Sequence, residues 1–259
     1  MRVFVIALLF FSLCLTGVQA LAENDAPANT SAPAATTSPE RWLLPLGIAA
    51  RASTLGFGAD IATPVTRHSN ARVGFNLFNY SRTLSKDQVS YAGTLRLQSV
   101  QTIYDFFPFA ANFHLSPGLL VYNGNKISAD ASVPITKSFS LGGYQYTAAG
   151  NIAGSANMSM NKVAPMFLVG WGNLVPRSHR HLTFSVEGGF VYQGSPDVKL
   201  ALTSGTVCIN GTATCKNPLN VATDSTVQAN IASEQTKLNN SISAFQFYPV
   251  ISFGFGYKF

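Results

Sequence analysis

Two histidine-serine segments are the first places in the sequence where catalytic chemistry could arise. His-Leu-Ser (114–116) and His-Ser-Asn (68–70) each place a hydroxyl close to an imidazole, and a serine nucleophile needs such a base to accept its proton. Both lie at or beside turn-rich segments, residues 106–112 and 63–70. We therefore interpret His114 and His68 as turn residues and predict no catalytic site.

A second pair of histidines has the spacing of metal ligands. His179 and His181 flank Arg180, with Arg177 nearby. Two imidazoles without an acidic or cysteine partner fall short of the three or four ligands that a zinc ion takes. We interpret this segment as a solvated basic turn, and we predict neither a metal nor a cofactor.

The cysteines suggest covalent chemistry in a loop. Cys208 and Cys215 enclose the turn residues of CINGTATC. A reactive or metal-binding thiol pair is the alternative to a structural bridge. We predict a disulfide, since such bridges persist in oxidising compartments and no histidine lies nearby in the sequence.

Alternating side chains dominate the rest of the chain. One set of alternate positions is apolar or aromatic, and the other mixes small residues with occasional charges; the clearest examples are ARVGFNLFNY, FHLSPGLLVYN, KVAPMFLVGWGN, HLTFSVEGGFVY and the terminal AFQFYPVISFGFGYKF. This period of two is typical of strands. Each run has about the 9–11 residues that a tilted membrane strand requires.

Composition separates a membrane barrel from a soluble sheet protein. Charged residues form 11% of the chain, against about a quarter in ordinary soluble domains. A soluble secreted β-sandwich is the alternative, but its outward faces should carry charge. The formal charge of +6 is not gathered into Lys/Arg runs, which argues against a nucleic-acid partner.

The ends of the chain differ from its middle. Residues 1–20 have the short basic start, apolar stretch and small-residue cleavage site of a secretory signal peptide. Residues 21–43 are rich in Ala, Pro, Thr and Ser, and we predict a disordered tether. Residues 44–259 should form the barrel, with long loops at 129–160 and 204–243. A helix is expected within 222–242, capped by Asp224 or Ser225.

The strand count depends on two changes of phase in the alternation. Within residues 46–61 the apolar set changes side near Ser53-Thr54, which indicates either a bulge or a tight hairpin there. We prefer the hairpin, which gives eight strands and keeps every short turn periplasmic. A strand near Phe139–Tyr146 is the other route to eight. Within residues 89–107 the set changes side near Ser99, which predicts a β-bulge. We predict an all-β, up-and-down antiparallel transmembrane β-barrel of eight strands.

Six charged residues fall on the predicted inner face. An eight-stranded barrel is just wide enough for side chains to fill, so these charges should pair across a plugged lumen; a narrow solute path is the alternative. Glu187 and the inward-facing His181 should lie roughly 20 Å apart along their strand, which is too far for them to act as a catalytic pair. The set is Arg51, Asp60, Arg72, Arg96, Glu187 and Lys258.

The last strand carries a resemblance to a known class. Phe255, Tyr257 and Phe259 alternate up to the C-terminus and resemble the signal that the barrel-assembly machinery reads in outer-membrane proteins. Together with the signal peptide and the alternation of short turns with long loops, this makes residues 44–259 resemble small porin-like barrels of the outer-membrane protein A and W types. The two histidine-serine segments resemble those of the barrel lipid A deacylases.

This resemblance implies a location, a set of partners and two functional classes. A monomer in the outer membrane, surrounded by outer-membrane lipid and lipopolysaccharide, is expected. The first class is non-enzymatic, either structural or passing small solutes. The second is a lipid A-modifying, deacylase-like enzyme, which the turn positions of the histidines disfavour. We therefore predict a protein that is not an enzyme.

Overall fold

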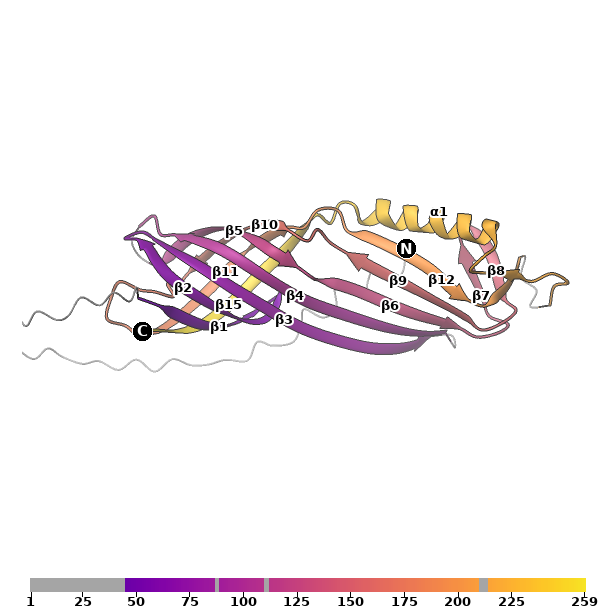
Figure 1. Cartoon of the computed structure of the whole chain (residues 1–259), viewed down its shortest axis with the longest axis horizontal. Helices are drawn as coiled ribbons and strands as arrows, with labels where there is room; N and C mark the ends of the chain where they lie inside the picture. The colour runs from indigo at the N-terminus through magenta and orange to yellow at the C-terminus, as the bar shows by residue number, and fades with distance from the viewer. Residues whose placement is uncertain (1–44, 87–88, 110–111, 210–213) are drawn as a thin grey trace, which may run out of the picture. The chain divides into compact units, whose positions relative to one another are not determined.

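The computed structural model describes residues 45–86, 89–109, 112–209 and 214–259. The signal peptide and tether expected at 1–20 and 21–43 lie outside them. Eight strands form a closed barrel (Figure 1). They are β1 (Gly47–Ser53), β2 (Gly56–Thr66), β3 (Ser69–Lys86), β4 (Val89–Phe106), β5 (Phe113–Asn123), β10 (Ala164–Trp171), β11 (Leu182–Tyr192) and β15 (Phe247–Lys258).

Closure of the barrel follows from the strand pairing. β1 pairs antiparallel with β2 on one side and with β15 on the other, and the remaining barrel strands follow one another in chain order. The predicted all-β, up-and-down barrel of eight strands is confirmed. The hairpin near Ser53-Thr54 is confirmed too, because β1 ends at Ser53 and β2 begins at Gly56.

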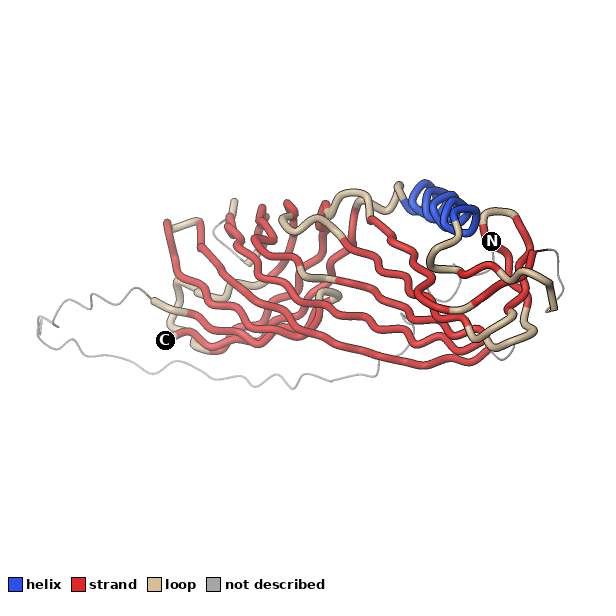
Figure 2. The backbone as a smooth tube through the Cα atoms, turned by 45° about the vertical axis from the view of Figure 1, so that its right-hand side comes forward, coloured by secondary structure: helices blue, strands red, loops and turns tan. Residues whose placement is uncertain are grey.

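Two of the barrel strands continue beyond the barrel. Where β4 leaves β5 it pairs with β6 (Lys126–Val133), which is followed in the sheet by β9 (Ile152–Ser159) and β12 (Asp197–Ser204). A separate sheet has the order β14 (Leu219–Asn220), β13 (Thr206–Ile209), β8 (Tyr144–Ala148) and β7 (Ser138–Leu141). The segments 129–160 and 204–243, expected as loops, thus contain regular elements (Figure 2). The strands near Phe139–Tyr146 are β7 and β8, and they do not enter the barrel.

The predicted helix is confirmed as α1, Ser225–Ile242, in which the Asp224 carboxylate caps the first turn by accepting from the amides of Thr226 and Val227. Val227 and Ile231 pack into an apolar core with Tyr146 of the second sheet. In the described part of the chain, no helix has the length and apolarity needed to cross a membrane.

The same helix covers the edge of strand β12. The Asn239 side-chain oxygen accepts from the amide of Val198 at 2.8 Å, and the Gln235 oxygen accepts from the amide of Leu200 at 3.0 Å. The Asn239 amide also donates to the carbonyl oxygen of Val198. Side chains of α1 therefore bind backbone groups that a further strand would otherwise use.

The register shift predicted near Ser99 occurs at the expected place, but the extra residue is on the partner strand, so it does not change the phase of β4. The register of β3 with β4 is unbroken from Ser69–Phe106 to Lys86–Val89. A register shift does occur between β4 and β5, but there Val100 and Gln101 face Tyr122 and Leu120, so the extra residue is Val121 on β5. The apolar set of β4 changes side because its surroundings change where it leaves the barrel.

Candidate functional site

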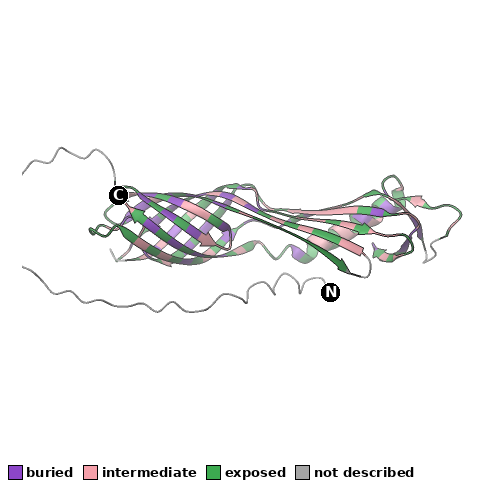
Figure 3. Ribbon diagram, turned by 90° about the horizontal axis from the view of Figure 1, so that it is seen from below, coloured by how far each residue is buried: buried purple, intermediate pink, exposed green. Residues whose placement is uncertain are grey.

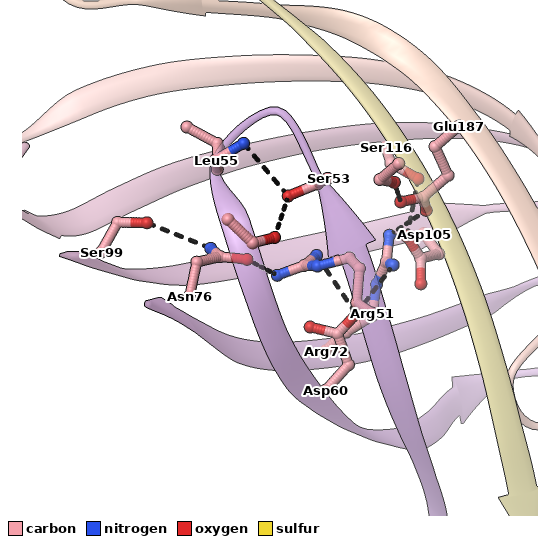
Figure 4. Close-up of polar contacts among 12 residues, drawn as sticks. Arg51, Ser53, Leu55, Asp60, Arg72, Asn76, Ser99, Asp105, Ser116 and Glu187 are labelled. Atoms are coloured by element: carbon pink, nitrogen blue, oxygen red, sulfur yellow. Dashed lines mark hydrogen bonds and ion pairs between the residues drawn. The ribbon is translucent and has the colours of Figure 1, made fainter. Parts of the chain in front are cut away.

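Charged side chains from five strands meet inside the barrel. Arg72 of β3 lies at the centre: its Nη2 donates to Asp105 Oδ1 at 2.8 Å and to Glu187 Oε1, and its Nη1 lies 3.5 Å from Asp60 Oδ2. Arg51 Nη1 contacts the same Asp60 oxygen at 3.1 Å. All five of these residues are buried. Figure 4 shows the two guanidinium groups on either side of Asp60.

Glycines on intervening strands let these charges reach one another. Gly170 of β10 pairs with His114 on one side and with Glu187 on the other. A Cβ at Gly170 would lie 2.6 Å from His114 Nε2 and 2.8 Å from Glu187 Cγ. Likewise, a Cβ at Gly74 would lie 1.9 Å from Asp60 Oδ1. The cluster therefore requires glycine at both positions, because a side chain there would clash with its charged groups.

Polar residues surround the ion pairs. Ser116 Oγ donates to Asp105 Oδ1 at 2.6 Å, and Ser252 Oγ donates to Glu187 Oε2 at 2.9 Å. Arg51 Nη2 donates to Asn76 Oδ1 at 3.0 Å. The Gln101 amide oxygen, when turned towards Arg51, accepts from both terminal nitrogens. Most lumen carboxylate and guanidinium atoms therefore have a protein partner.

His114 belongs to this cluster, so its interpretation as a turn residue is wrong. Its Nδ1 lies 3.1 Å from the carbonyl oxygen of Asn112, and its Nε2 lies 3.1 Å from Glu187 Oε1. Both oxygens accept hydrogen bonds, so the arrangement fits an imidazolium that donates from each nitrogen. That charge also balances the cluster, in which two guanidiniums face three carboxylates.

Little space remains beside the cluster. A cavity of about 10 Å³ is lined by residues that include Asp60, Arg72, His114 and Glu187, which is room for about one water molecule. Asp60 Oδ1 and the Nε atoms of Arg51 and Arg72 lack a partner among the described residues. On the other side of the cluster, Leu55, Leu168 and Val250 belong to an apolar core of buried residues inside the barrel.

Three side chains of the cluster are of types that bind metal ions. Ligand atoms of Asp105, His114 and Glu187 lie within 4.8 Å of one another. However, Arg72 Nη2 already donates to both carboxylates. A divalent cation would have to replace a guanidinium that is buried with them, so this arrangement favours an ion-pair site over a metal centre.

The inner-face residues predicted from the sequence separate into two groups. Arg51, Asp60, Arg72 and Glu187 come together in the lumen. Arg96 does not: its side chain is exposed beyond the barrel and donates to Gln98 Oε1 at 2.9 Å. This correction follows from the unbroken register of β4, in which even-numbered residues point outwards.

Lys258 lies at one end of the barrel rather than in the cluster. Its Nζ donates to the carbonyl oxygens of Pro176 and Ser178, at 2.8 and 2.6 Å. Arg177, in the same turn, donates to Asn70 Oδ1 at 2.8 Å and to the Ser69 carbonyl oxygen. Partial burial lowers the pKa of the Arg177 guanidinium. This turn therefore binds a neighbouring turn instead of being merely solvated.

The other histidines lie at the barrel's short turns. His181 Nδ1 lies 2.9 Å from the carbonyl oxygen of Lys258, and its ring stacks on Tyr257. His68 and His179 are exposed. The sequence reasoning missed His114, Asp105 and Ser116, although His114 and Ser116 share their alternation with the inner positions of β5.

The remaining named residues lie away from the cluster. Cys208, in strand β13, and Cys215 are joined by the expected disulfide. Phe255, Tyr257 and Phe259 are exposed at the C-terminal end of the chain. Recognition of these three residues by the barrel-assembly machinery stays a prediction.

Comparison with known proteins supports the class of fold, a closed eight-stranded antiparallel barrel. No protein-family model and no curated protein matches the chain. Crystal structures of CarO and CarO2 from Acinetobacter baumannii are similar to it, with TM-scores of 0.53 and sequence identities of 20% and 17%. Each similarity covers 85% of this chain and 100% of the other. At these identities the likeness concerns the fold.

Proposed function

We propose that this protein is an integral outer-membrane β-barrel that is non-enzymatic and structural, with a lumen sealed against solutes. In this role the barrel anchors the sheets and helix formed by β6–β9, β12–β14 and α1 on the outer side of the membrane. The observation that carries the proposal is the filled lumen, in which an ion-pair cluster and an apolar core follow one another along the barrel.

An apolar outer surface supports the membrane location. On β3, Val73, Phe75 and Leu77 point outwards and are about half exposed, while Arg72 and Asn76 are buried. Figure 3 shows this alternation of buried and exposed residues along the barrel strands. Exposing such a belt to water would be costly, whereas hydrocarbon accommodates it.

The direction of insertion follows from the two ends of the barrel. Strands β2, β4, β10 and β15 end where the chain finishes with Phe259, and the connections that follow the first three of them are short. The long insertions between β5 and β10 and between β11 and β15 leave the other end. Short periplasmic turns and long external segments are typical of outer-membrane barrels. A monomer in contact with outer-membrane lipid and lipopolysaccharide, assembled by the barrel-assembly machinery, completes the proposal.

The enzyme alternative requires a nucleophile and a base in contact. Ser116 donates to Asp105, whereas both nitrogens of His114 are bonded elsewhere. The residues thus form a charge-balanced cluster of ion pairs instead of a serine–histidine relay. Its position within the barrel, next to a cavity for about one water molecule, also leaves no room for a lipid substrate.

Planar-bilayer recording of the refolded mature protein tests the sealed lumen. We expect no steady channels, whereas steady single-channel steps would overturn the sealed lumen in favour of solute passage. The same preparation should release no fatty acid from lipopolysaccharide. Release that disappears in both His114→Ala and His114→Gln, with both variants still migrating as folded barrels on unheated gels, would overturn the non-enzymatic class.

A further inference from the structure

The sheet beyond the barrel has one apolar face and one polar face. The apolar face continues the inner face of the barrel, because Leu95 and Leu97 share their side of β4 with the buried Ser99 and Gln101. On the polar face, β3 presents Ser81 and Thr83, and β4 presents Thr94 and Arg96. At its far side the apolar face is covered, since Leu200, Leu202 and Val133 pack against the second core.

Register places the apolar side chains in three rows that cross the sheet. The middle row runs from the edge of the sheet inwards and consists of Arg82, Gly93, Ala129, Ala156 and Leu200. One flanking row consists of Tyr80, Leu95, Ile127, Met158 and Val198, and the other of Leu84, Tyr91, Ala131, Gly154 and Leu202. Small residues thus fill the centre of the middle row, with larger apolar side chains beside them.

The part of this face near β3 and β4 is open to solvent. Tyr80, Leu84, Tyr91 and Ile127 are each between 41% and 45% exposed. A Cβ added at Gly93 would meet one atom within 4 Å, the Arg82 carbonyl oxygen at 3.7 Å. Apolar side chains in this number, exposed together beside an open strip of small residues, are unusual unless they bind something.

The cationic side chain of Arg82 lies at the outer end of the middle row. Arg82 is exposed, and no ion pair joins it to another residue in the described ranges. It is the one charged residue in the three rows. Here a guanidinium, which binds carboxylate and phosphate through paired hydrogen bonds, adjoins an apolar strip, and the three rows hold no acidic partner for it.

We propose that this face binds a single-chain amphiphile with an anionic head group, either a carboxylate or a phosphate. The head group pairs with Arg82, and the alkyl chain lies over Gly93, Ala129 and Ala156. Three strand spacings separate β3 from β9, about 14 Å in all, which suits a chain of roughly a dozen carbons. The binding site lies outside the barrel lumen and is separate from the sealed-barrel proposal.

Two other occupants fit these observations less well. A second copy of the chain would bring its own Arg82 to the interface, and the three rows hold no acidic residue to pair with it; an unpaired buried charge is costly. A peptide laid across the face would leave its own amides without partners, because the backbone groups of β4, β6 and β9 are already paired with neighbouring strands. An alkyl chain has no such groups.

Titration calorimetry on the mature protein in nanodiscs of zwitterionic lipid tests the proposal. The probes are dodecanoate, dodecyl phosphate and dodecyltrimethylammonium, with empty nanodiscs as the reference. We expect the two anions to bind with one-to-one stoichiometry and the cation at least 10-fold more weakly. Comparison of the two anions identifies the preferred head group. Equal binding of the cation, or heats that match empty nanodiscs, would overturn the proposal.

Matched variants locate the site. Arg82→Gln should weaken anion binding about 10-fold or more, whereas Arg96→Gln, on the opposite face of the same sheet, should leave it unchanged. Gly93→Val keeps Arg82 but occupies the strip, and it should also weaken binding. All three are surface changes, and heat-modifiable migration checks that each barrel is folded. Unchanged affinity in Arg82→Gln, or dimerisation that excludes the probes, would contradict the assignment.

Discussion

The two ends of strands β3 and β4 have opposite patterns of polarity. Within the barrel, their inner side carries Arg72, Asn76 and Asp105, and their outer side carries apolar residues such as Phe75. Beyond the barrel, the inner side is apolar and the outer side carries Ser81 and other polar residues. The register does not change between the two regions. What changes is the proposed medium on the outer side, from hydrocarbon to water.

The inversion falls at the pair formed by Leu77 and Gln98. From Ser69 to Leu77, β3 spans nine positions, in agreement with the length that a membrane strand needs. A change of phase in a barrel sequence can therefore mark the membrane boundary rather than a β-bulge.

Removing the central cation should destabilise the barrel most. Arg72→Leu leaves Asp60, Asp105 and Glu187 buried with too little positive charge, and loss of one partner from such a cluster costs about 3–5 kcal/mol. Urea unfolding of the protein in detergent micelles, followed by loss of the fast-migrating form on gels, measures the change. Arg67→Leu, in an exposed turn, should change stability by less than about 0.5 kcal/mol. Equal effects would show that the lumen cluster does not hold the barrel together.

A charge on the outer side should be harmful within the barrel and harmless beyond it. Phe75→Arg places a cation in the proposed hydrocarbon zone, at a cost of about 2–4 kcal/mol near the midplane. Thr83→Arg, on the same side of the same strand, should have little effect. Unfolding in lipid vesicles measures both. Similar costs at both positions would contradict the boundary at Leu77 and Gln98.

Filling the space between His114 and Glu187 should have a smaller effect. Gly170→Ala brings a methyl group within 2.6 Å of His114 Nε2 and 2.8 Å of the Val186 carbonyl oxygen, and such overpacking costs about 1–3 kcal/mol. Gly188→Ala is the matched control, because its Cβ meets nothing within 4 Å. The difference in urea midpoint between these variants isolates the contact. A control as unstable as Gly170→Ala would assign the loss to backbone effects.

Local patterns were sufficient to predict the barrel, but the site depends on relations between strands. Alternation and the changed phase at Ser53-Thr54 gave the strand count, and the Asp224 cap gave the start of α1. The approach of His114 to Glu187 was missed because it passes across Gly170, on a third strand far away in the sequence. Arg96 was misplaced because the change of phase in β4 was attributed to a bulge.

The second sheet and its helix show a further limit. Segments 129–160 and 204–243 looked like loops because β7, β8 and β13 are short. The apolar residues of these strands are far apart in the sequence and come into contact only in the folded chain. Strands of four or five residues carry too few alternations to stand out from polar surroundings. The disulfide was easier to predict, since its two cysteines lie close together in the sequence.

The amide side chains of α1 that form hydrogen bonds with the edge of β12 also limit how copies of this protein can associate. Asn239 and Gln235 bind backbone groups that could otherwise nucleate a continuous sheet between neighbouring molecules. At the opposite margin of the sheet, the positive charge of Arg82 opposes pairing of two like strands. Even when crowded together in the proposed membrane, molecules of this protein would thus remain separate units instead of joining into fibres.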